Sequence, residues 1–413
     1  MKKRVIVLGA GIIGMSCAYY LHHEGHQVLV IDKAQVGKGT SYLNSGYITP
    51  SHFTPMVSPG ILRTALKFLL DPSGPLYIKP RFDLDFLRWG IRFIGNATPK
   101  NVESSIDTLL KMSMMSKRLY KELSQKLKFD FGLSESGLLA TYRTSKVEKI
   151  ESQLAKRGRD LGLEIHQLSK EQVDQMQQAP MDIEGAFWYK DDAHTTPDIF
   201  MKGLFEYLNS HGVEFLFNKE ITRLEKTKAN RVILCDGKQS IEADEIVLAS
   251  GSWSGKLLKS IGIDLLLQPG KGYSFHINYS GISLPAILTE AKVAVTPMFG
   301  KTRIGGTMEI SGFDGQINFK RVEAIRIAAQ SYYPDVNFSK ENCECVQMGF
   351  RPLTPDGVPY IGRIRGCDNL ILATGHAMVG WSLGPVTGKL VSQIVSNQKS
   401  SIDISRCSPN RKI

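Results

Sequence analysis

The first 32 residues carry the feature that most constrains this chain, an apolar strand that runs directly into a glycine-rich turn. Residues 4–8 read RVIVL, residues 9–14 read GAGIIG, and a second apolar run ends on Asp32. The three glycines permit a tight turn, close approach of the backbone to a pyrophosphate, and packing of helix on strand. The helix N-terminus offers unpaired N–H groups to phosphate, and Asp32 can accept hydrogen bonds from a ribose diol. The pattern predicts a dinucleotide-binding βαβ unit.

The same stretch partly resembles a secretory signal, because residues 2–4 are basic and apolar residues follow. Two glycines, a polar helix and the lack of a small-residue cleavage site favour a buried first strand instead. No other segment has the uninterrupted apolar length that a bilayer span needs. We therefore expect a cytoplasmic protein, either soluble or peripheral on the inner face of the cell membrane.

Composition limits the classes of partner. The chain has 413 residues, enough for two domains, and a formal net charge of +11. Such a charge suits an anionic membrane surface, acidic ligands or a solvated surface without a partner. Nucleic acid is disfavoured, because no basic run interleaves with aromatic residues. Cys343 and Cys345 form the only close cysteine pair, and their spacing fits neither zinc nor redox motifs, so we expect free buried thiols and no metal site.

The elements expected after Asp32 mix helices with strands. Amphipathic spacing predicts a long helix over 101–128. A cap residue, a proline and an acid at 196–198 begin a second helix, which we expect to run to His211. Further elements are expected in these ranges: a strand over 131–142, a strand over 246–251, antiparallel strands within 264–312, a strand over 370–373 and a closing helix over 381–395.

The predicted fold class is α/β, with a Rossmann-like dinucleotide-binding domain and a substrate domain built on a largely antiparallel β-sheet with helices. No linker or repeat separates the two, so we expect discontinuous domains. The dinucleotide-binding domain is expected to comprise 1–60, 145–262 and 345–413. The substrate-binding domain is expected to comprise 61–144 and 263–344.

Four further blocks carry a family resemblance. They read GTSYLNSG at 39–46, DPSGPL with IKPR at 71–81, GFRPLTPDG at 349–357, and GH with GWSLGP at 375–385. Together with the N-terminal turn, they make the chain similar to the D-amino-acid oxidase superfamily of FAD-dependent enzymes, over nearly its whole length. That superfamily includes glycine oxidase and the bacterial D-amino-acid dehydrogenases, and the block at 71–81 resembles the dehydrogenase branch.

The resemblance implies FAD rather than NAD as the cofactor of the dinucleotide-binding domain. The loop after Asp32 and the late glycine-rich turn are the segments that the family places against FAD. The implied cofactor-binding residues are Gly9, Gly11, Ile12, Ile13, Gly14, Asp32, Lys33, Gly39, Thr40, Ser41, Asn44, Gly46, Ile221, Gly251, Gly375, His376, Gly380, Trp381 and Ser382.

Two residues are candidates for catalysis. The resemblance aligns Arg351 with the arginine that clamps the substrate carboxylate, and a guanidinium fork matches a carboxylate bidentately. An interdomain salt bridge is the alternative role for Arg351. Tyr273 is a second candidate for the same carboxylate, with aromatic core packing as its alternative. His376 is expected to contact the flavin rather than to act as a base. His52 is expected at the surface, with a place in the active site as its alternative.

The resemblance further implies oxidation of free D-amino acids in amino-acid catabolism, by hydride transfer from Cα to flavin N5. The products would be an imino or keto acid and ammonia, and D-proline or hydroxy-D-proline is a candidate substrate. Electrons would pass to a quinone or another acceptor. Two alternatives stay open: an oxygen-using amino-acid, glycine or N-methyl amine oxidase of the same superfamily, and a non-catalytic FAD-binding subunit of a complex.

Residues 56–94 mix apolar and basic side chains, as interfacial membrane helices do. The apolar residues are Ile61, Leu62, Leu66, Phe68, Leu69, Trp89 and Phe93, and the basic ones are Arg63, Lys67, Lys79, Arg81, Arg88 and Arg92. Members of the dehydrogenase branch pass electrons to the respiratory chain, so we expect a membrane- or quinone-facing segment here. The alternative is that these apolar residues cover the substrate domain.

Overall fold

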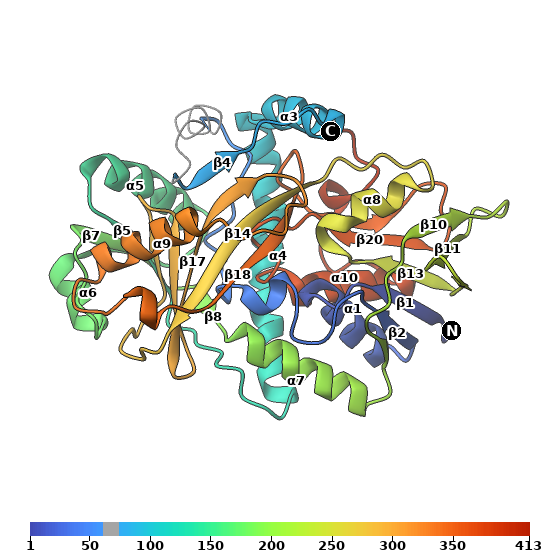
Figure 1. The fold of residues 1–413 in the computed structure, drawn as a ribbon, viewed down its shortest axis with the longest axis horizontal. Coiled ribbons are helices and arrows are strands. Elements are labelled where there is room, and N and C mark those ends of the chain that lie inside the picture. Colours follow the sequence, from blue (N-terminus) through green and yellow to red (C-terminus); the bar gives the residue numbers. More distant parts are fainter. Residues whose placement is uncertain (61–73) are drawn as a thin grey trace.

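Two large sheets with helices packed against them make up the described part of this computed structural model, residues 1–60 and 74–413 (Figure 1). One sheet has six strands in the order β19–β20–β13–β1–β2–β9, and the other has nine. The long helix α4 (Pro99–Lys126) runs through the middle of the view, between the two sheets. The protein therefore has the mixed α/β architecture that the sequence predicts.

The six-stranded sheet is built on the predicted N-terminal unit. Its central strand β1 pairs in parallel with both β2 and β13, while β19 runs antiparallel to β20. Both of its faces are covered by apolar clusters, which explains why its strands read as continuous apolar runs. The strands are β1 (Arg4–Leu8), β2 (Gln27–Ile31), β9 (Glu214–Leu216), β13 (Glu245–Leu248), β19 (Tyr360–Arg363) and β20 (Leu370–Thr374).

Helices α1 (Ile12–His23) and α10 (Gly384–Val395) pack closely together on one face of this sheet. A Cβ added at Gly388 would overlap the backbone of Ser16, so glycine is required where the helices meet. The predicted helices over 101–128 and 196–211 are confirmed as α4 and α7 (Pro197–Ser210), and each carries proline in its first turn. Both contribute buried side chains to the same apolar cluster.

The nine-stranded sheet is centred on β14 (Gln268–Ile277), which pairs antiparallel with β17 (Lys301–Ile310) and β18 (Glu344–Leu353). The antiparallel strands expected within 264–312 are confirmed, although β15 pairs in parallel with β5. The strand expected over 131–142 is shorter, at 138–142. The other strands are β4 (Leu76–Ile78), β5 (Leu138–Tyr142), β6 (Ile165–Ser169), β7 (Gly185–Tyr189), β15 (Ala286–Leu288) and β16 (Val293–Met298).

Shorter elements complete the described chain. They are the strands β3 (Tyr47–Ile48), β8 (Ala193–His194), β10 (Arg223–Lys226), β11 (Val232–Cys235) and β12 (Ser240–Ile241), and the helices α3 (Leu84–Asn96), α5 (Ser145–Asp160), α6 (Lys170–Met176), α8 (Ser254–Lys259) and α9 (Phe319–Tyr332). The six cysteines are free, but Cys345 is exposed and Cys343 half-buried, which corrects the expectation that both are buried.

The division into sheets differs from the predicted domain ranges in three places. Strands β6 and β7 fall within 145–262, and β18 falls mostly within 345–413, yet all three belong to the nine-stranded sheet. Helix α4 was expected in the substrate domain; Val102 and Ile106 near its start pack with β5 and β7 of the nine-stranded sheet, whereas its buried apolar residues from Leu109 onward pack with α1, α7 and α10. Apolar periodicity identifies a strand or helix without specifying its partner. The domain ranges therefore remain a proposal, with these segments exchanged.

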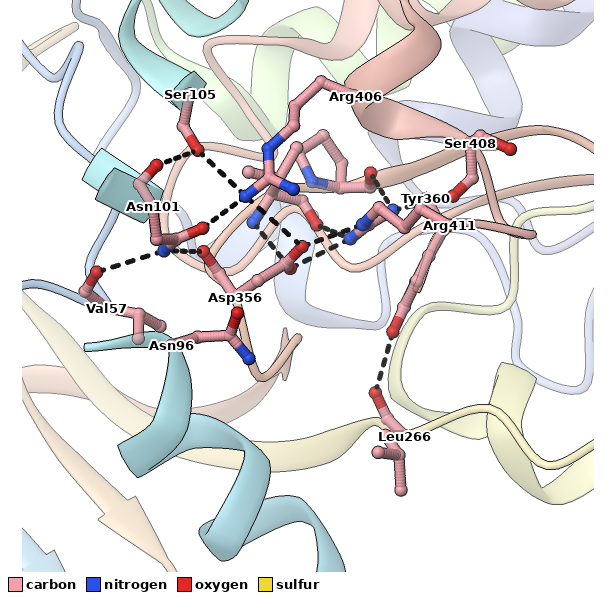
Figure 2. A network of polar contacts seen from close by, with 12 residues as sticks. Val57, Asn96, Asn101, Ser105, Leu266, Asp356, Tyr360, Arg406, Ser408 and Arg411 are labelled. Carbon is pink, nitrogen blue, oxygen red and sulfur yellow. Dashed lines mark hydrogen bonds and ion pairs between the residues drawn. The ribbon is translucent and has the colours of Figure 1, made fainter. Parts of the chain in front are cut away.

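The C-terminal residues are tied to the start of α4 and to the loop after β18 (Figure 2). Arg411 makes a bidentate ion pair with the buried Asp356, from Nε to Oδ2 at 2.8 Å and from Nη2 to Oδ1 at 2.9 Å. Asn101 donates to the backbone oxygen of Asp356 at 3.0 Å and accepts a hydrogen bond from Arg406. These contacts anchor the C-terminal residues to the rest of the protein.

Replacing Arg411 with methionine is expected to destabilise the protein by about 3–5 kcal/mol, because it removes the bidentate partner of the buried Asp356 carboxylate and leaves only Arg406, 4.0 Å away. Urea denaturation followed by circular dichroism measures this loss. Lys111→Met is the matched control, since Lys111 pairs with Asp107 at the exposed surface, where ion pairs contribute little. Equal losses for the two variants would contradict the assigned role of the Asp356–Arg411 pair.

Candidate active site

A continuous cavity of about 1880 Å³ is lined by residues of both sheets. Sites for one small molecule typically occupy about 300–1,000 Å³, so this cavity has room for more than one ligand. Most residues of the predicted cofactor set line it, and so do Arg351 and Tyr273. Sequence segments far apart in the chain are thus brought together at one place.

The glycine-rich turn forms one end of the cavity. Gly9 has a φ of +113°, and a Cβ there would lie 2.5 Å from the backbone oxygen of Ala249. A Cβ at Gly14 would clash with the backbone oxygen of Gly9, whereas Gly11 borders the cavity and only the Ser41 hydroxyl lies near its Cβ position. Gly11, the N-cap residue of α1, offers no capping side chain, while Ser41 Oγ of the loop over 39–46 accepts from the N–H of Ile12 at 2.9 Å. The first turn of the helix borders the cavity and fits the pyrophosphate of a dinucleotide.

Asp32 is fixed at the end of β2 by two backbone donors. Its Oδ2 accepts from the N–H of Ala10 at 2.7 Å, and its Oδ1 accepts from that of Ala34 at 2.8 Å. A carboxylate oxygen has more than one lone pair, so each keeps acceptor capacity toward the cavity that Asp32 lines. The arrangement fits the predicted role of binding a ribose diol. Lys33 lies beside it, with Nζ 3.9 Å from the ring centre of Trp253.

The loop over residues 39–46 is held against the nine-stranded sheet. Thr40 Oγ1 accepts a hydrogen bond from the backbone N–H of Phe350 at 3.0 Å. Arg303, which the sequence reasoning missed, donates from Nη1 to the backbone oxygens of Tyr42 and Asn44 at 2.9 and 2.7 Å. No local motif marks Arg303, because its partners lie about 260 positions earlier in the chain. This buried arginine positions the predicted cofactor loop.

Four residues of the predicted cofactor set lie beneath the cavity wall rather than on it: Gly14, Gly46, Gly375 and Ser382. A Cβ at Gly46 would overlap the backbone oxygen of Thr195, and the Ser382 hydroxyl accepts from the N–H of Thr49 at 2.7 Å. These residues support the lining. The direct cofactor contacts expected of them remain predictions.

The late turn presents His376, Gly380 and Trp381 to the cavity. His376 Nε2 lies 3.0 Å from Thr387 Oγ1, while its buried Nδ1 has no hydrogen-bond partner in residues 1–60 and 74–413. Burial lowers the pKa of His376 to about 3, so the ring is neutral at pH 7. A neutral ring with a free nitrogen fits a hydrogen bond with a bound cofactor.

Arg351 places a cation in the cavity without a neutralising partner. Its guanidinium lies over Gly272, where any Cβ would overlap it, and Nη1 donates to the backbone oxygen of Thr307 at 2.7 Å. No carboxylate of the described residues forms an ion pair with it, so the alternative role, an interdomain salt bridge, is not found there. Burial lowers the pKa of Arg351 to about 10, which leaves it charged at pH 7. An anionic ligand would satisfy its remaining donors.

The hydroxyl of Tyr273 already has hydrogen-bond partners within the protein. It donates to Glu309 Oε2 at 2.7 Å and accepts from the N–H of Asn318, the capping residue of α9, at 3.4 Å. Burial and the neighbouring Glu309 raise the pKa of Tyr273. The phenol is therefore engaged on the α9 side of the sheet, and its contact with a substrate stays a prediction. The free donors of Arg351 make it the stronger candidate.

Comparisons with known proteins agree with this geometry. Residues 4–394 match the model of the DAO family, described as FAD dependent oxidoreductase. A D-amino acid dehydrogenase of Neisseria meningitidis is 31% identical, over 97% of this chain and 97% of that protein. The crystal structure of glycine oxidase from Geobacillus kaustophilus superposes with a TM-score of 0.80 at 21% identity, over 100% of this chain and 99% of the other. L-Proline dehydrogenase from P. horikoshii has a TM-score of 0.76 at 17% identity, over 99% and 97%.

Proposed function

This chain belongs to the DAO family of FAD-dependent oxidoreductases, and from that premise we propose that it oxidises free D-amino acids as a dehydrogenase. The observation that carries the proposal is Arg351, a half-buried cation on the cavity wall whose free donors face no carboxylate among the described residues. A free amino acid supplies the missing carboxylate. The relatives named D-amino acid dehydrogenase support this choice of substrate.

Different residues of the chain bind the cofactor and the substrate in this proposed reaction. The turn over 9–14, Asp32 and the loop over 39–46 hold FAD, which when bound accepts the two electrons released from Cα as a hydride. Arg351 holds the carboxylate, so that the orientation of the substrate is fixed by at least two hydrogen bonds. The amine must be neutral, because only a nitrogen lone pair can form the C=N bond. The imino acid hydrolyses to a keto acid and ammonia, or remains a cyclic imine for D-proline or hydroxy-D-proline.

Anaerobic mixing of the purified holoenzyme with a panel of D- and L-amino acids tests this proposal. We expect D-amino acids, with D-proline and hydroxy-D-proline in the panel, to bleach the flavin absorbance. Reoxidation by a quinone analogue should then be much faster than reoxidation by oxygen. Faster reoxidation by oxygen would instead indicate an oxidase, and bleaching only by other reductants would refute amino-acid oxidation.

We further propose that helix α3 rests on an anionic membrane surface, where a quinone acceptor is available. Among the described residues, no helix combines the length and apolar character needed to cross a bilayer. Leu84, Leu87, Ile91 and Ile94 form an exposed stripe at helical spacing on α3, with Leu84 78% and Ile91 70% exposed. Helix α3 lies at the outer edge of the molecule (Figure 1).

The other face of α3 corrects part of the sequence prediction. Trp89 is buried and donates from Nε1 to the backbone oxygen of Leu353 at 3.0 Å, and Phe93 packs on Trp89, so neither belongs to an exposed surface. The predicted membrane residues over 61–70 lie outside the described residues. Arg88 and Arg92 are both exposed on α3; Arg88 pairs with Asp264, and Arg92 adds positive charge that complements an anionic bilayer.

The double variant Leu87→Ser, Ile91→Ser is expected to weaken partition into anionic phospholipid vesicles at least tenfold, because each exposed side chain would lose about 1.5–3 kcal/mol of apolar transfer. Sedimentation with vesicles measures the partition. Phe319→Ser, at an exposed residue of α9, is the matched control and should bind as the unmodified protein does. Unchanged partition of the α3 variant would dispose of the membrane proposal.

A further inference from the structure

A chain of hydrogen bonds runs from the cavity into the protein through His52, Ser51 and Asp192. Ser51 Oγ donates to Asp192 Oδ2 at 2.5 Å, and its backbone N–H donates to Asp192 Oδ1 at 3.0 Å. His52 Nδ1 lies 3.1 Å from the same Ser51 hydroxyl. Ser51 and His52 both line the cavity, whereas Asp192 is fully buried behind them.

The direction of these bonds fixes the tautomer of His52. The single hydroxyl hydrogen of Ser51 is donated to Asp192, so Ser51 Oγ can only accept from His52, and Nδ1 must carry a proton. In neutral His52, Nε2 then holds a free lone pair, and no residue of the described chain hydrogen-bonds to it. The result is an unoccupied acceptor at the cavity end and a carboxylate at the buried end.

Burial, more than the nearby charges, places the proton-binding capacity at the buried end. Burial raises the pKa of Asp192 to about 7, although the hydrogen bonds from Ser51 and the charge of Lys117 on α4 oppose this. Asp191 and Tyr189 are the other titratable groups beside it. Burial lowers the pKa of His52 to about 4, and Lys292 at the start of β16 lowers it further. His52 is therefore a carrier, and Asp192 is the group that holds a proton near neutral pH.

We propose that His52, Ser51 and Asp192 form a proton relay that deprotonates the ammonium group of the substrate before it is oxidised. This inference rests on the proposed function. An N–H bond of the ammonium breaks and its proton passes to His52 Nε2. The Nδ1 proton passes to Ser51 Oγ, and the Ser51 hydroxyl proton passes to Asp192 Oδ2. The amine is left neutral with its lone pair, Asp192 becomes uncharged, and no electrons are transferred in this step.

His52 is the catalytic residue of the relay, because it alone is proposed to touch the substrate. Ser51 and Asp192 act through it. The relay accepts a proton only when Asp192 is ionised, so the activity should rise as the pH increases through about 7. Without the relay, the ammonium group must lose its proton to water, and the rise should shift toward the higher pH at which that occurs in solution.

Ser51→Ala tests the relay through the pH profile of anaerobic flavin reduction by D-alanine and D-proline. At pH 7 we expect a loss of about 10²-fold or more, recovered largely at high pH, because proton transfer by a positioned group contributes about 10²–10⁴-fold. Ser51→Thr keeps the hydroxyl and should restore the rise near pH 7. Reduction by Ser51→Ala with the unmodified pH profile would overturn the relay while leaving the proposed function intact.

A second measurement does not depend on substrate. Because the pKa of Asp192 is raised on folding, the folded state binds a proton between pH 4 and 7 that the unfolded state has released, and stability falls as the pH rises. We expect the unfolding equilibrium constant of the holoenzyme to increase about tenfold per pH unit relative to Asp192→Asn. Asp191→Asn, at the neighbouring carboxylate, is the matched control and should behave as the unmodified protein.

Identical pH dependence of stability for Asp192→Asn and the unmodified protein would overturn the assignment of Asp192 as the proton holder. Failure of every D-amino acid to reduce the flavin would overturn the proposed function, and the role of the relay with it. The two failures are distinguishable, since the first is read from unfolding and the second from flavin absorbance.

Discussion

Replacing Arg351 with methionine is expected to lower kcat/KM for D-amino acids by about 10²–10⁴-fold. The substrate would lose two charge-assisted hydrogen bonds, each contributing about 1.5–3 kcal/mol. Methionine approximates the length of the arginine stem, so the space above Gly272 stays filled. The free energy of unfolding should fall little or even rise, because a half-buried cation without a paired carboxylate among the described residues is removed.

Two readouts separate binding of the carboxylate from a structural effect. The flavin content of Arg351→Met should match that of the unmodified protein, since the segments proposed to hold the cofactor, the turn over 9–14 and the loop over 39–46, are unchanged. Arg351→Lys keeps the charge but loses the planar fork, so its kcat/KM should lie between those of the unmodified protein and Arg351→Met. A methionine variant with unchanged kcat/KM would show that Arg351 does not bind the substrate carboxylate.

Replacing Gly11 with valine is expected to abolish retention of FAD. Gly11 has an ordinary extended backbone, with a φ of −73°, and of the atoms around its Cβ position only Ser41 Oγ is close, at 3.2 Å. The chain should therefore still fold, with the valine side chain filling the approach to the N-terminus of α1. The ratio of flavin to protein absorbance measures retention, and far-ultraviolet circular dichroism reports the fold.

Gly90→Val is the matched control for Gly11→Val. Gly90 lies in α3, and a Cβ there meets nothing within 4 Å, so the variant should retain full flavin content at some loss of helix stability. If Gly11→Val purified with stoichiometric FAD, the turn over 9–14 would not be the pyrophosphate-binding element. The new side chain lies beside Ser41 Oγ at the cavity in Gly11→Val, whereas in Gly90→Val its Cβ meets nothing within 4 Å.

Local sequence signals predicted the parts of the fold that depend on neighbouring residues. The turn over 9–14, the proline-initiated helix at 197 and the closing strand at 370 are each set by residues within a few positions of one another. Apolar period also identified α4 to within two residues at each end. Which sheet a strand joins depends on distant partners, and this is why β6, β7 and β18 were placed with the wrong sheet.

In the candidate site, too, sequence motifs predicted some residues, while the contacts between distant segments could not be predicted. Family motifs in the sequence identified Asp32, Thr40 and Arg351 as site residues, and in the fold all three line one cavity. The partnership of Ser51 with Asp192 joins residues 141 positions apart, and Asp192 carries no motif of its own. His52 was expected at the surface, whereas it lines the cavity and is half-buried. Burial of a polar group depends on what packs over it, and sequence spacing does not encode that.

The measurement that tests the central claim most directly is the rate of anaerobic flavin reduction by D-proline, L-proline and pyrrolidine. We expect rapid reduction by D-proline, slow reduction by its enantiomer, and slow reduction by pyrrolidine, which has the amine but no carboxylate for Arg351. D-Alanine, L-alanine and ethylamine form the matching acyclic series, in case the substrate is not a cyclic amino acid. Comparable rates across both series would contradict a site built around the carboxylate of a D-amino acid.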